Sequence, residues 1–451
     1  MISYIEPKIL KGFRDFLPPA EIARRDLIEK IEAVFRSYGF VPIDTPALEY
    51  ARILLGKGGG ETEKQIYRFN DNGDRDVALR FDLTVPFARF VALHLAEITL
   101  PFKRYHIAKV WRGENTQRGR YREFTQCDVD TVGSDSPASD FEILLMIRNV
   151  FTALGVDVSI RVNHRGLFNR FLVVIGTEEK SVEILRTVDK LSKIGKDETQ
   201  KLLEELTDAE NAKKILAFIG AGGGAGGSVC SFEQTLAAMT SLSGGSSPES
   251  ERLALLRRFM LDTGIEKSFV LDPSITRGLD YYTGVVFETF LTELPDIGSV
   301  CSGGRYDNLA GLYTKSRGEN VSGVGTSIGL DRLIAALESL EKLPAVQNYA
   351  STAIACLNEE NGGLYQALAE KFREAGVPCE VFLEPSKSSD SKQLVKQYVL
   401  AEKKGIRWLV IPPEDLKPED LEKCQLTLRD LGARQNREGT IYEAIKIIKG
   451  E

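Results

Sequence analysis

The sequence predicts a multidomain protein that combines an α+β domain, a helical insertion and a C-terminal α/β domain. Three observations support this fold class. Strand-like alternation dominates residues 65–133, residues 166–262 are helical and rich in charge, and strand-like and helix-like segments alternate over 351–451. The chain has 451 residues, enough for about three domains of ordinary size.

The composition is typical of a folded protein in a reducing compartment. Charged residues make up 27% of the chain and hydrophobic residues 43%, which argues against a disordered, collagenous or coiled-coil protein. There is no run of about 18 apolar residues and no apolar N-terminal segment, so we expect neither a membrane span nor secretion. Six cysteines without a CxxC pair and only three histidines argue against a zinc ribbon, a disulfide scaffold or a His-rich metal site, and suit the cytoplasm. A net charge of −7 gives no overall attraction to nucleic acid but permits a local basic groove.

The first predicted element is a helix that ends at Gly39. Its apolar residues recur at helical spacing: Leu27, Ile28, Ile31, Val34 and Phe35. The next segment, GFVPIDTPALEY, is expected to be extended because Pro42 and Pro46 exclude a helix interior. The glycine-rich segment 56–63 lacks the lysine of a P-loop, so we interpret it as a loop, either plainly flexible or able to cover a substrate.

Strands are expected next. Between Val77 and Val85, apolar residues alternate with Arg80, Asp82 and Thr84, which predicts a strand with a polar face. Residues 104–112 and 121–132 predict two further strands, which the loop GENTQRGR would join as an antiparallel pair. The residues on one face of the second strand are Arg122, Phe124, Gln126, Asp128 and Asp130, four of them polar or charged. A sheet face this polar indicates function more than packing.

The remaining segments complete the predicted layout. A helix over 139–154 and the strand VSIRVNH precede the helical insertion, whose glycine tract at 220–228 we interpret as a flexible loop. Strands are expected within 275–291 and 297–304, and 323–337 is expected to run from strand into helix. We therefore expect a core over 1–340 interrupted by the insertion at 166–262, a linker at 341–350, and a parallel-rich βαβαβ unit over 351–451.

Two sets of polar residues point to the chemistry. Guanidinium groups suit phosphate because they are planar, multidentate and permanently charged, and four arginines lie near glycine turns: Arg112, Arg120, Arg277 and Arg332. A second set suits a small zwitterion with a hydrogen-bonding side chain, and comprises Asp82, Thr84, Gln126, Asp130, Tyr281 and Tyr282. Phosphate together with a zwitterion indicates amino-acid activation.

These motifs resemble the histidyl-tRNA synthetase branch of the class II aminoacyl-tRNA synthetases over essentially the whole chain. KGFRDFLP at 11–18 resembles the N-terminal opening of that family, and GFVPIDTPALEY resembles its motif 1. The stretch from Arg112 to Asp130 resembles motif 2, and Gly329–Arg332 resembles motif 3. RGLDYYTG at 277–284 and SGGRYD at 302–307 resemble the histidine-specific motifs, which carry the most specific part of the likeness.

The resemblance implies a class II catalytic domain, with an antiparallel sheet flanked by helices, and a C-terminal anticodon-binding domain. It implies ATP as a substrate, Mg²⁺ held mainly by the ATP phosphates rather than by a protein metal site, and L-histidine and tRNA(His) as the other substrates. It also implies a cytoplasmic homodimer formed through motif 1. The catalytic residues would be Arg112 and Arg277. The histidine-binding residues would be Asp82, Thr84, Arg112, Gln126, Asp130, Arg277, Tyr281 and Tyr282, and the ATP-binding residues would be Arg112, Glu114, Arg120, Phe124 and Arg332.

Several of these positions also have a purely structural interpretation. Arg332 could simply pair with a carboxylate, Phe124 could pack within the sheet, and Asp130 could brace the sheet through a salt bridge. Cys127, on the opposite face of its strand, and the three histidines (His94, His106 and His164) are interpreted as structural. At the level of the whole chain, two alternatives are a non-catalytic histidine-binding paralogue, such as the regulatory subunit of ATP phosphoribosyltransferase, and a tRNA-sensing pseudo-synthetase. Motifs that are all intact and a complete C-terminal unit favour the enzyme over both.

Overall fold

The structure is a computed structural model that describes residues 4–56, 64–223, 230–276, 281–307, 309, 311, 313, 321–343, 345–385 and 390–451. The chain divides into two compact units, one of Met1–Arg14 with Leu27–Leu343 and the other of Asp15–Asp26 with Pro344–Glu451. Within the described parts of the chain, no helix combines the length and apolar character needed to cross a bilayer.

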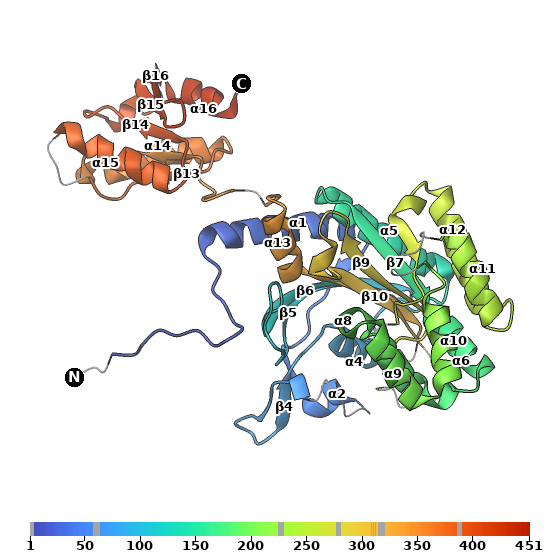
Figure 1. The fold of residues 1–451 in the computed structure, drawn as a ribbon. Coiled ribbons are helices and arrows are strands. Elements are labelled where there is room, and N and C mark those ends of the chain that lie inside the picture. The colour runs from blue at the N-terminus through green and yellow to red at the C-terminus, as the bar shows by residue number, and fades with distance from the viewer. Residues whose placement is uncertain are drawn as a thin grey trace. The chain divides into compact units, whose positions relative to one another are not determined.

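A mixed sheet forms the centre of the first unit (Figure 1). In the described residues its eight strands have the order β1-β5-β6-β11-β10-β9-β7-β8. In that order they are β1 (Val41–Pro42), β5 (Phe102–Trp111), β6 (Glu123–Val132), β11 (Gly323–Gly329), β10 (Cys301–Tyr306), β9 (Val285–Leu291), β7 (Val158–His164) and β8 (Phe269–Leu271). All neighbours from β5 to β7 are antiparallel, whereas the short outer strands β1 and β8 pair in parallel.

The predicted antiparallel pair is confirmed as β5 and β6. The register places Arg104 opposite Asp130 and Val110 opposite Phe124. On its other side β6 pairs with β11, so that Gly325 also faces Asp130. A Cβ atom at Gly325 would lie 1.9 Å from Asp130 Oδ1, so only glycine leaves room for this carboxylate.

The strand expected over 77–85 is wrong in its second half. β4 (Asp76–Leu79) ends early, and α4 (Thr84–His94) begins at Thr84. Asp82 Oδ1 accepts a hydrogen bond of 3.1 Å from the backbone N–H of Val85, which satisfies a donor in the first turn of the helix. This local hydrogen bond overrides the alternating pattern. A small antiparallel sheet joins β4 to β2 (Leu48–Tyr50) and β3 (Arg68–Asn70), beside α2 (Ala51–Leu55).

Helices cover the main sheet: α1 (Pro18–Ser37), α5 (Pro137–Ala153) and α13 (Leu330–Ser339). Residues of α5 at helical spacing, Ile143, Leu144 and Ile147, are buried in the same apolar cluster as Cys127 and Val129 of β6. The interpretation of Cys127 as a core residue is therefore confirmed.

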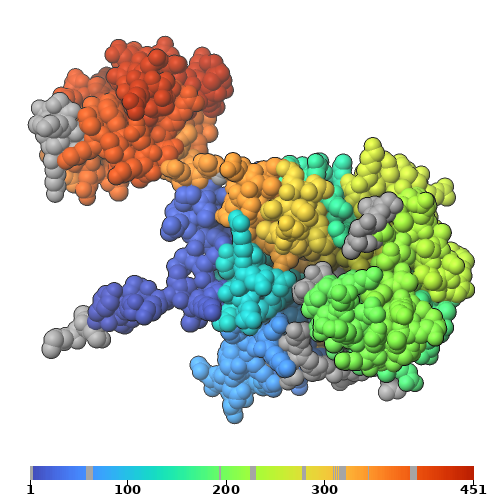
Figure 2. All heavy atoms as spheres, in the orientation of Figure 1, coloured from blue at the N-terminus to red at the C-terminus, as the bar shows by residue number. Residues whose placement is uncertain are grey.

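The expected helical segment is present between β7 and β8. It comprises α6 (Arg165–Val174), α7 (Ser181–Val188), α8 (Leu191–Ile194), α9 (Lys196–Leu206), α10 (Ala209–Ile219), α11 (Phe232–Leu242) and α12 (Pro248–Asp262). We call this part of the chain segment α6–α12. In Figure 2 it forms one contiguous mass, coloured green to yellow. Short 3-10 helices occur at Glu178–Lys180, Glu266–Ser268, Pro295–Ile297, Glu359–Asn361 and Pro418–Asp420.

The C-terminal part of the chain forms an α/β sheet of its own with the order β13-β12-β14-β15-β16. Its elements are β12 (Thr352–Ile354), α14 (Gly362–Glu374), β13 (Cys379–Val381), α15 (Asp390–Lys403), β14 (Trp408–Ile411), β15 (Leu426–Asp430), β16 (Gln435–Gly439) and α16 (Ile441–Lys449). The first three strands are parallel, as the βαβαβ pattern predicts, and an antiparallel hairpin follows them.

Candidate active site

Asp130, near the end of β6, lies in a cluster of buried polar side chains, which we call the polar pocket. Its Oδ2 atom is 2.6 Å from Nη2 of Arg104, and its Oδ1 accepts a 2.6 Å hydrogen bond from the hydroxyl of Tyr306. All three side chains are buried. Both carboxylate oxygens therefore have a partner in the protein, although each retains a lone pair that could accept a further N–H donor. Burial raises the pKa of Asp130, and the charge of Arg104 opposes that rise.

Asp128 and Gln126 lie on the same face of β6 as Asp130, two and four residues before it in the chain. Asp128 is 1% exposed, and its Oδ1 has no hydrogen-bond partner among the described residues. Burial raises its pKa to about 7, while Arg104 and a hydrogen bond to Ser327 act in the opposite direction. Gln126 donates a 2.8 Å hydrogen bond to the Ser327 hydroxyl, and its Oε1 is buried without a partner. Asp128 and Gln126 thus each present a buried oxygen that has no hydrogen-bond donor among the described residues.

Asp82 adds a third buried carboxyl group next to these residues. Burial raises its pKa to about 6, against the effects of the Val85 N–H, Arg112 and Arg104. Its Oδ2 has no hydrogen-bond partner in the described structure. Thr84 follows at the first position of α4, half-buried. A pocket with three buried carboxyl groups and Arg104 as its fully buried cation is suited to an ammonium group that brings a positive charge.

The nearby end of the β5–β6 pair carries the arginines expected to bind phosphate. Arg112 donates from Nε to the carbonyl of Phe81 at 2.8 Å, and its guanidinium lies 5.2 Å from the centre of the Phe124 ring. Glu114 has carboxylate oxygens 3.8 Å from Nη1 of Arg112 and 3.4 Å from Nη1 of Arg120. Glu114 therefore holds two arginines in one partly exposed cluster.

Arg332, in the first turn of α13, joins this arginine cluster. Burial, together with the neighbouring charge of Arg120, lowers its pKa to about 10, and the charge of Glu114 opposes that change. Its Nη1 donates to the Ser299 carbonyl at 2.6 Å, and among the described residues it forms no ion pair with a carboxylate. Crowded cations of this kind favour an anionic ligand. The cluster Arg112, Arg120 and Arg332, with Glu114 and Phe124, is called the arginine cluster below.

The neighbouring residue Asp331 fixes α13 to this site. Its Oδ2 accepts a 2.7 Å hydrogen bond from the backbone N–H of Thr125, and its Oδ1 pairs with Arg14. Arg14 also lies over the ring of Tyr121. The N-terminal segment, β6 and α13 are thereby held in register around the arginine cluster.

Tyrosines from the two histidine-specific motifs meet beside Asp130. The ring of Tyr281 lies 4.7 Å from that of Tyr282 and packs edge-on against Tyr306 at 6.3 Å. Gly304 makes room for this arrangement, since a Cβ atom there would lie 2.9 Å from the ring of Tyr282. Tyr282 is buried and Tyr281 partly buried.

The structure thus brings most of the predicted residues together. Asp82, Gln126 and Asp130 share the buried pocket with Tyr281 and Tyr282 at its side, and the five residues of the arginine cluster adjoin it through Arg112. Arg277 lies outside the described residues, as do 57–63 and 224–229 of the two glycine-rich loops.

Sequence reasoning missed two residues of the pocket, Arg104 and Tyr306. The register of the predicted hairpin could have identified Arg104, because opposite charges on facing strands attract. No local signal identifies Tyr306 as the partner of Asp130, which lies 176 positions away.

Two histidines have structural roles, as predicted. Burial lowers the pKa of His106 to about 4, and its Nε2 lies 2.9 Å from Asp44 Oδ1. Burial also lowers the pKa of His164 to about 4, and its Nδ1 accepts a hydrogen bond from the Gly166 N–H at the start of α6.

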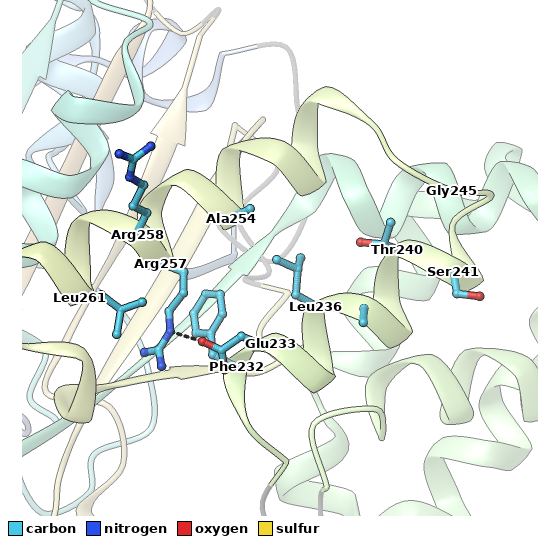
Figure 3. Close-up of a pocket in the computed structure, with 11 residues that line it drawn as sticks. Phe232, Glu233, Leu236, Thr240, Ser241, Gly245, Ala254, Arg257, Arg258 and Leu261 are labelled. Atoms are coloured by element: carbon cyan, nitrogen blue, oxygen red, sulfur yellow. Dashed lines mark hydrogen bonds and ion pairs between the residues drawn. The ribbon is translucent and has the colours of Figure 1, made fainter.

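A separate pocket of about 630 Å³ lies between α11 and α12 (Figure 3). Its lining is mostly apolar, and Arg257 and Glu233 form an ion pair of 2.6 Å at its edge. None of the residues predicted to bind histidine or ATP lines it. This pocket is therefore separate from the predicted site on β6.

Comparison with known proteins places this fold and its polar site among the aminoacyl-tRNA synthetases. A family model described as histidyl-tRNA synthetase matches residues 12–333. The chain is 53% identical to the histidine–tRNA ligase of Treponema denticola over an alignment of 456 positions, which covers 100% of this chain and 99% of the relative. It is 46% identical to that of Rhodopirellula baltica, with 90% of each chain covered. The crystal structure of histidyl-tRNA synthetase from Nostoc sp. PCC 7120 superposes with a TM-score of 0.82 at 31% identity and covers 99% of this chain and 100% of that one. This chain belongs to the histidyl-tRNA synthetase family.

Proposed function

We propose that this protein is a histidine–tRNA ligase, which activates L-histidine with ATP and transfers the histidyl group to the 3′ end of tRNA(His). The observation that carries the proposal is the position of two complementary sites on one strand. β6 contributes Gln126, Asp128 and Asp130 to the buried polar pocket and Phe124 to the arginine cluster. An amino acid in the first site and the phosphates of ATP in the second would meet at Arg112.

The first step is an in-line attack by a carboxylate oxygen of histidine on the α-phosphorus of ATP. A new P–O bond forms, the bond to the β-phosphate breaks, and pyrophosphate leaves. Both reactants are anions, so the enzyme must neutralise and orient them. Arg112 adjoins Asp82 on one side and Glu114 on the other, which suits it to contact both the histidine carboxylate and the α-phosphate. Arg277 would supply a second cation, as the family resemblance implies.

The same site would transfer the histidyl group. A hydroxyl of the terminal ribose of the tRNA attacks the carbonyl carbon of the adenylate, the ester bond to the tRNA forms, and AMP leaves with the electrons of the mixed-anhydride bond. No nucleophilic side chain is required for either step.

Histidine would be selected by groups that pair with both ring nitrogens. Asp130 would accept from a ring N–H with its remaining lone pairs, and Tyr282 would meet the other nitrogen. The α-ammonium group would lie against Asp82 and Gln126, whose buried oxygens Oδ2 and Oε1 have no other hydrogen-bond partner in the described structure. Sites that pair every polar atom of a substrate reject analogues lacking one by about 10⁴-fold or more.

ATP would bind through the arginine cluster, with its adenine on the ring of Phe124 and its phosphates on Arg112, Arg120 and Arg332. Mg²⁺ bound together with ATP would be held mainly by the nucleotide and would offset part of the phosphate charge. Glu114 is the carboxylate of this cluster and could offer one oxygen to that ion.

The wider organisation follows the class II synthetases. We assign residues 1–340 to the catalytic core with 166–262 as an inserted helical domain, 341–350 to a linker, and 351–451 to the anticodon-binding domain of a cytoplasmic protein. Motif 1 would form a homodimer, since apolar side chains within it are exposed in the single chain, including Val41 at 47% and Tyr50 at 43%.

The proposal is tested by ATP–pyrophosphate exchange with the purified protein. We expect exchange that depends on histidine, followed by charging of tRNA(His) when tRNA is added. Exchange without tRNA charging would contradict the ligase assignment. Histidine binding without any exchange would instead identify the non-catalytic paralogue.

A further inference from the structure

Asp140 bridges two arginines from distant parts of the chain. This carboxylate lies in the first turn of α5 and is completely buried. Its Oδ1 accepts from Nε and Nη2 of Arg305 on β10, at 2.8 and 2.6 Å. Its Oδ2 accepts from Nε of Arg252 on α12, at 2.6 Å. The bridge therefore links segment α6–α12 to a strand of the central sheet.

Arg252 is held at the bridge by more than one bond. Its Nη1 lies 3.2 Å from Asp135 Oδ1, and its Nη2 donates to the Asp135 carbonyl at 3.0 Å. All three nitrogens of its guanidinium are thus engaged, and its side chain is 14% exposed. A planar fork with this many bonds fixes orientation as well as distance.

Arg305 extends the bridge to the segment that follows Arg277. The backbone N–H of Thr283 donates to the Arg305 carbonyl at 2.8 Å, and the Thr283 hydroxyl donates to Asp307 Oδ2 at 2.5 Å. Asp307 in turn lies 3.3 Å from Nη1 of Arg305. The aliphatic stem of Arg305 also packs against Gly284, where a Cβ atom would lie 3.0 Å from it. Both ends of this arginine therefore support residues 283 and 284.

Residues 283 and 284 lie next to the polar pocket around Asp130 in the chain. Tyr281 and Tyr282 precede Thr283, and Tyr306, whose hydroxyl contacts Asp130, follows Arg305. A shift of Arg305 would move its own backbone and that of Thr283, and with them three tyrosines of the pocket. The two bonds from Arg305 to Asp140 are charged and buried, so they hold this arginine in one defined geometry.

We propose that Arg252, in segment α6–α12, is a positioning residue for histidine binding, because it fixes Arg305 through Asp140 and thereby orders the tyrosine side of the pocket. The inference rests on the proposed function, since it concerns the same histidine site. It assigns to α12 a role in recognition of the amino acid, in addition to any role that segment α6–α12 has toward tRNA.

Arg257 provides a matched control on the same helix. It is also an arginine of α12 in an ion pair of 2.6 Å, and its side chain is 18% exposed. Its partner, Glu233, belongs to α11 (Figure 3), so this pair stays within segment α6–α12. Removal of Arg257 therefore tests for any general weakening of the segment.

The test compares Arg252→Met, Arg252→Lys and Arg257→Met in ATP–pyrophosphate exchange on the full chain. We expect Arg252→Met to raise KM for histidine about 10-fold while KM for ATP changes less than about two-fold. Arg252→Lys should recover part of the loss, because an ammonium can reach Asp140 but not Asp135 at the same time. Arg257→Met should leave both KM values unchanged. If Arg252→Met does not fold, Arg252→Lys carries the test with the same criterion, a rise in KM for histidine alone.

Coupling between two sites is reciprocal, which gives a second readout independent of activity. In the wild type, saturating L-histidine should slow hydrogen exchange of the α12 amides, and it should do so in Arg257→Met but not in the Arg252 variants. Equal KM shifts in the Arg252→Met and Arg257→Met proteins, or unchanged histidine affinity with undiminished protection of α12 in Arg252→Met, would overturn the inference. Absence of histidine-dependent exchange in the wild type would overturn the proposed function instead.

Discussion

Arg104 and Asp130 form an ion pair that is wholly removed from solvent, with 2.6 Å between Nη2 and Oδ2 and side-chain exposures of 0% and 3%. The two residues are direct neighbours across β5 and β6. The ring of Phe87 lies against the Arg104 guanidinium, with 4.0 Å between the ring centre and Cζ of Arg104. The pair holds the carboxylate on which histidine selection is proposed to depend.

Asp130→Ala is expected to destabilise the protein strongly as well as impair histidine binding. The substitution leaves Arg104 buried without its countercharge, which typically costs about 3–5 kcal/mol. Tyr306→Phe removes only a hydrogen bond to the same carboxylate and should cost about 1–2 kcal/mol. Urea denaturation of the two variants and the wild type measures the difference. A loss below about 1 kcal/mol for Asp130→Ala would show that the pair does not stabilise the fold.

Asp128→Asn is expected to change how stability depends on pH. Burial raises the pKa of Asp128 from 3.8 to about 7, so the folded protein holds a proton there that the unfolded chain releases. The stabilising effect of that proton is complete below the unfolded pKa and is lost as pH rises through about 7. An amide in this place should therefore make the variant more stable than the wild type near pH 8, by up to about 4 kcal/mol, and the difference should shrink toward pH 5.

Asp208→Asn is the control for that experiment. Asp208 caps α10, and hydrogen bonds from the backbone N–H groups of Asn211 and Glu210 lower its pKa. Its stabilising effect is present above the unfolded pKa and is lost only at lower pH. The difference from the wild type should thus be the same at pH 5 and pH 8. A difference for Asp128→Asn that is equally flat would contradict the raised pKa.

Arg332→Met is expected to weaken ATP binding selectively. Burial and the charge of Arg120 both disfavour the charged form of the Arg332 guanidinium. An anionic ligand would stabilise that charge. Loss of one charged contact should raise KM for ATP about 10-fold or more and leave KM for histidine within about two-fold. Arg161→Met serves as a control, since Arg161 pairs with Asp272 at the other side of the sheet. Pyrophosphate exchange in which both KM values change alike would exclude a specific ATP contact.

Removal of residues 345–451 is expected to separate the two steps of the reaction. None of the residues assigned to histidine or ATP lies in this part of the chain, so histidine-dependent exchange should persist in the shortened protein. Charging of tRNA(His) should fall sharply, because anticodon bases are recognised largely as unpaired nucleotides by a dedicated surface. Undiminished charging by a shortened, folded protein would assign another role to this unit.

The order of elements could be predicted because it depends on local periodicity. The β5–β6 pair, α5 and the parallel strands of the C-terminal sheet all follow from apolar spacing and glycine stops along the chain. The exception is the start of α4, where the alternation around Asp82 resembles a strand. There the backbone N–H of Val85 donates a hydrogen bond to the Asp82 side chain at the start of the helix, and alternation alone does not reveal such a bond.

The residue types available for the chemistry follow from the sequence alone, namely the arginines for phosphate and the carboxylates and tyrosines for histidine. Tertiary structure decided how they are partnered. Asp130 faces Arg104 because of the register between β5 and β6, and it contacts Tyr306 because β10 belongs to the same sheet. Arg252 reached Arg305 only because α12 packs on α5 at Asp140. The reason is physical: a buried charge requires a counterpart within about 3 Å, and the fold, not the local sequence, sets which residue is at that distance.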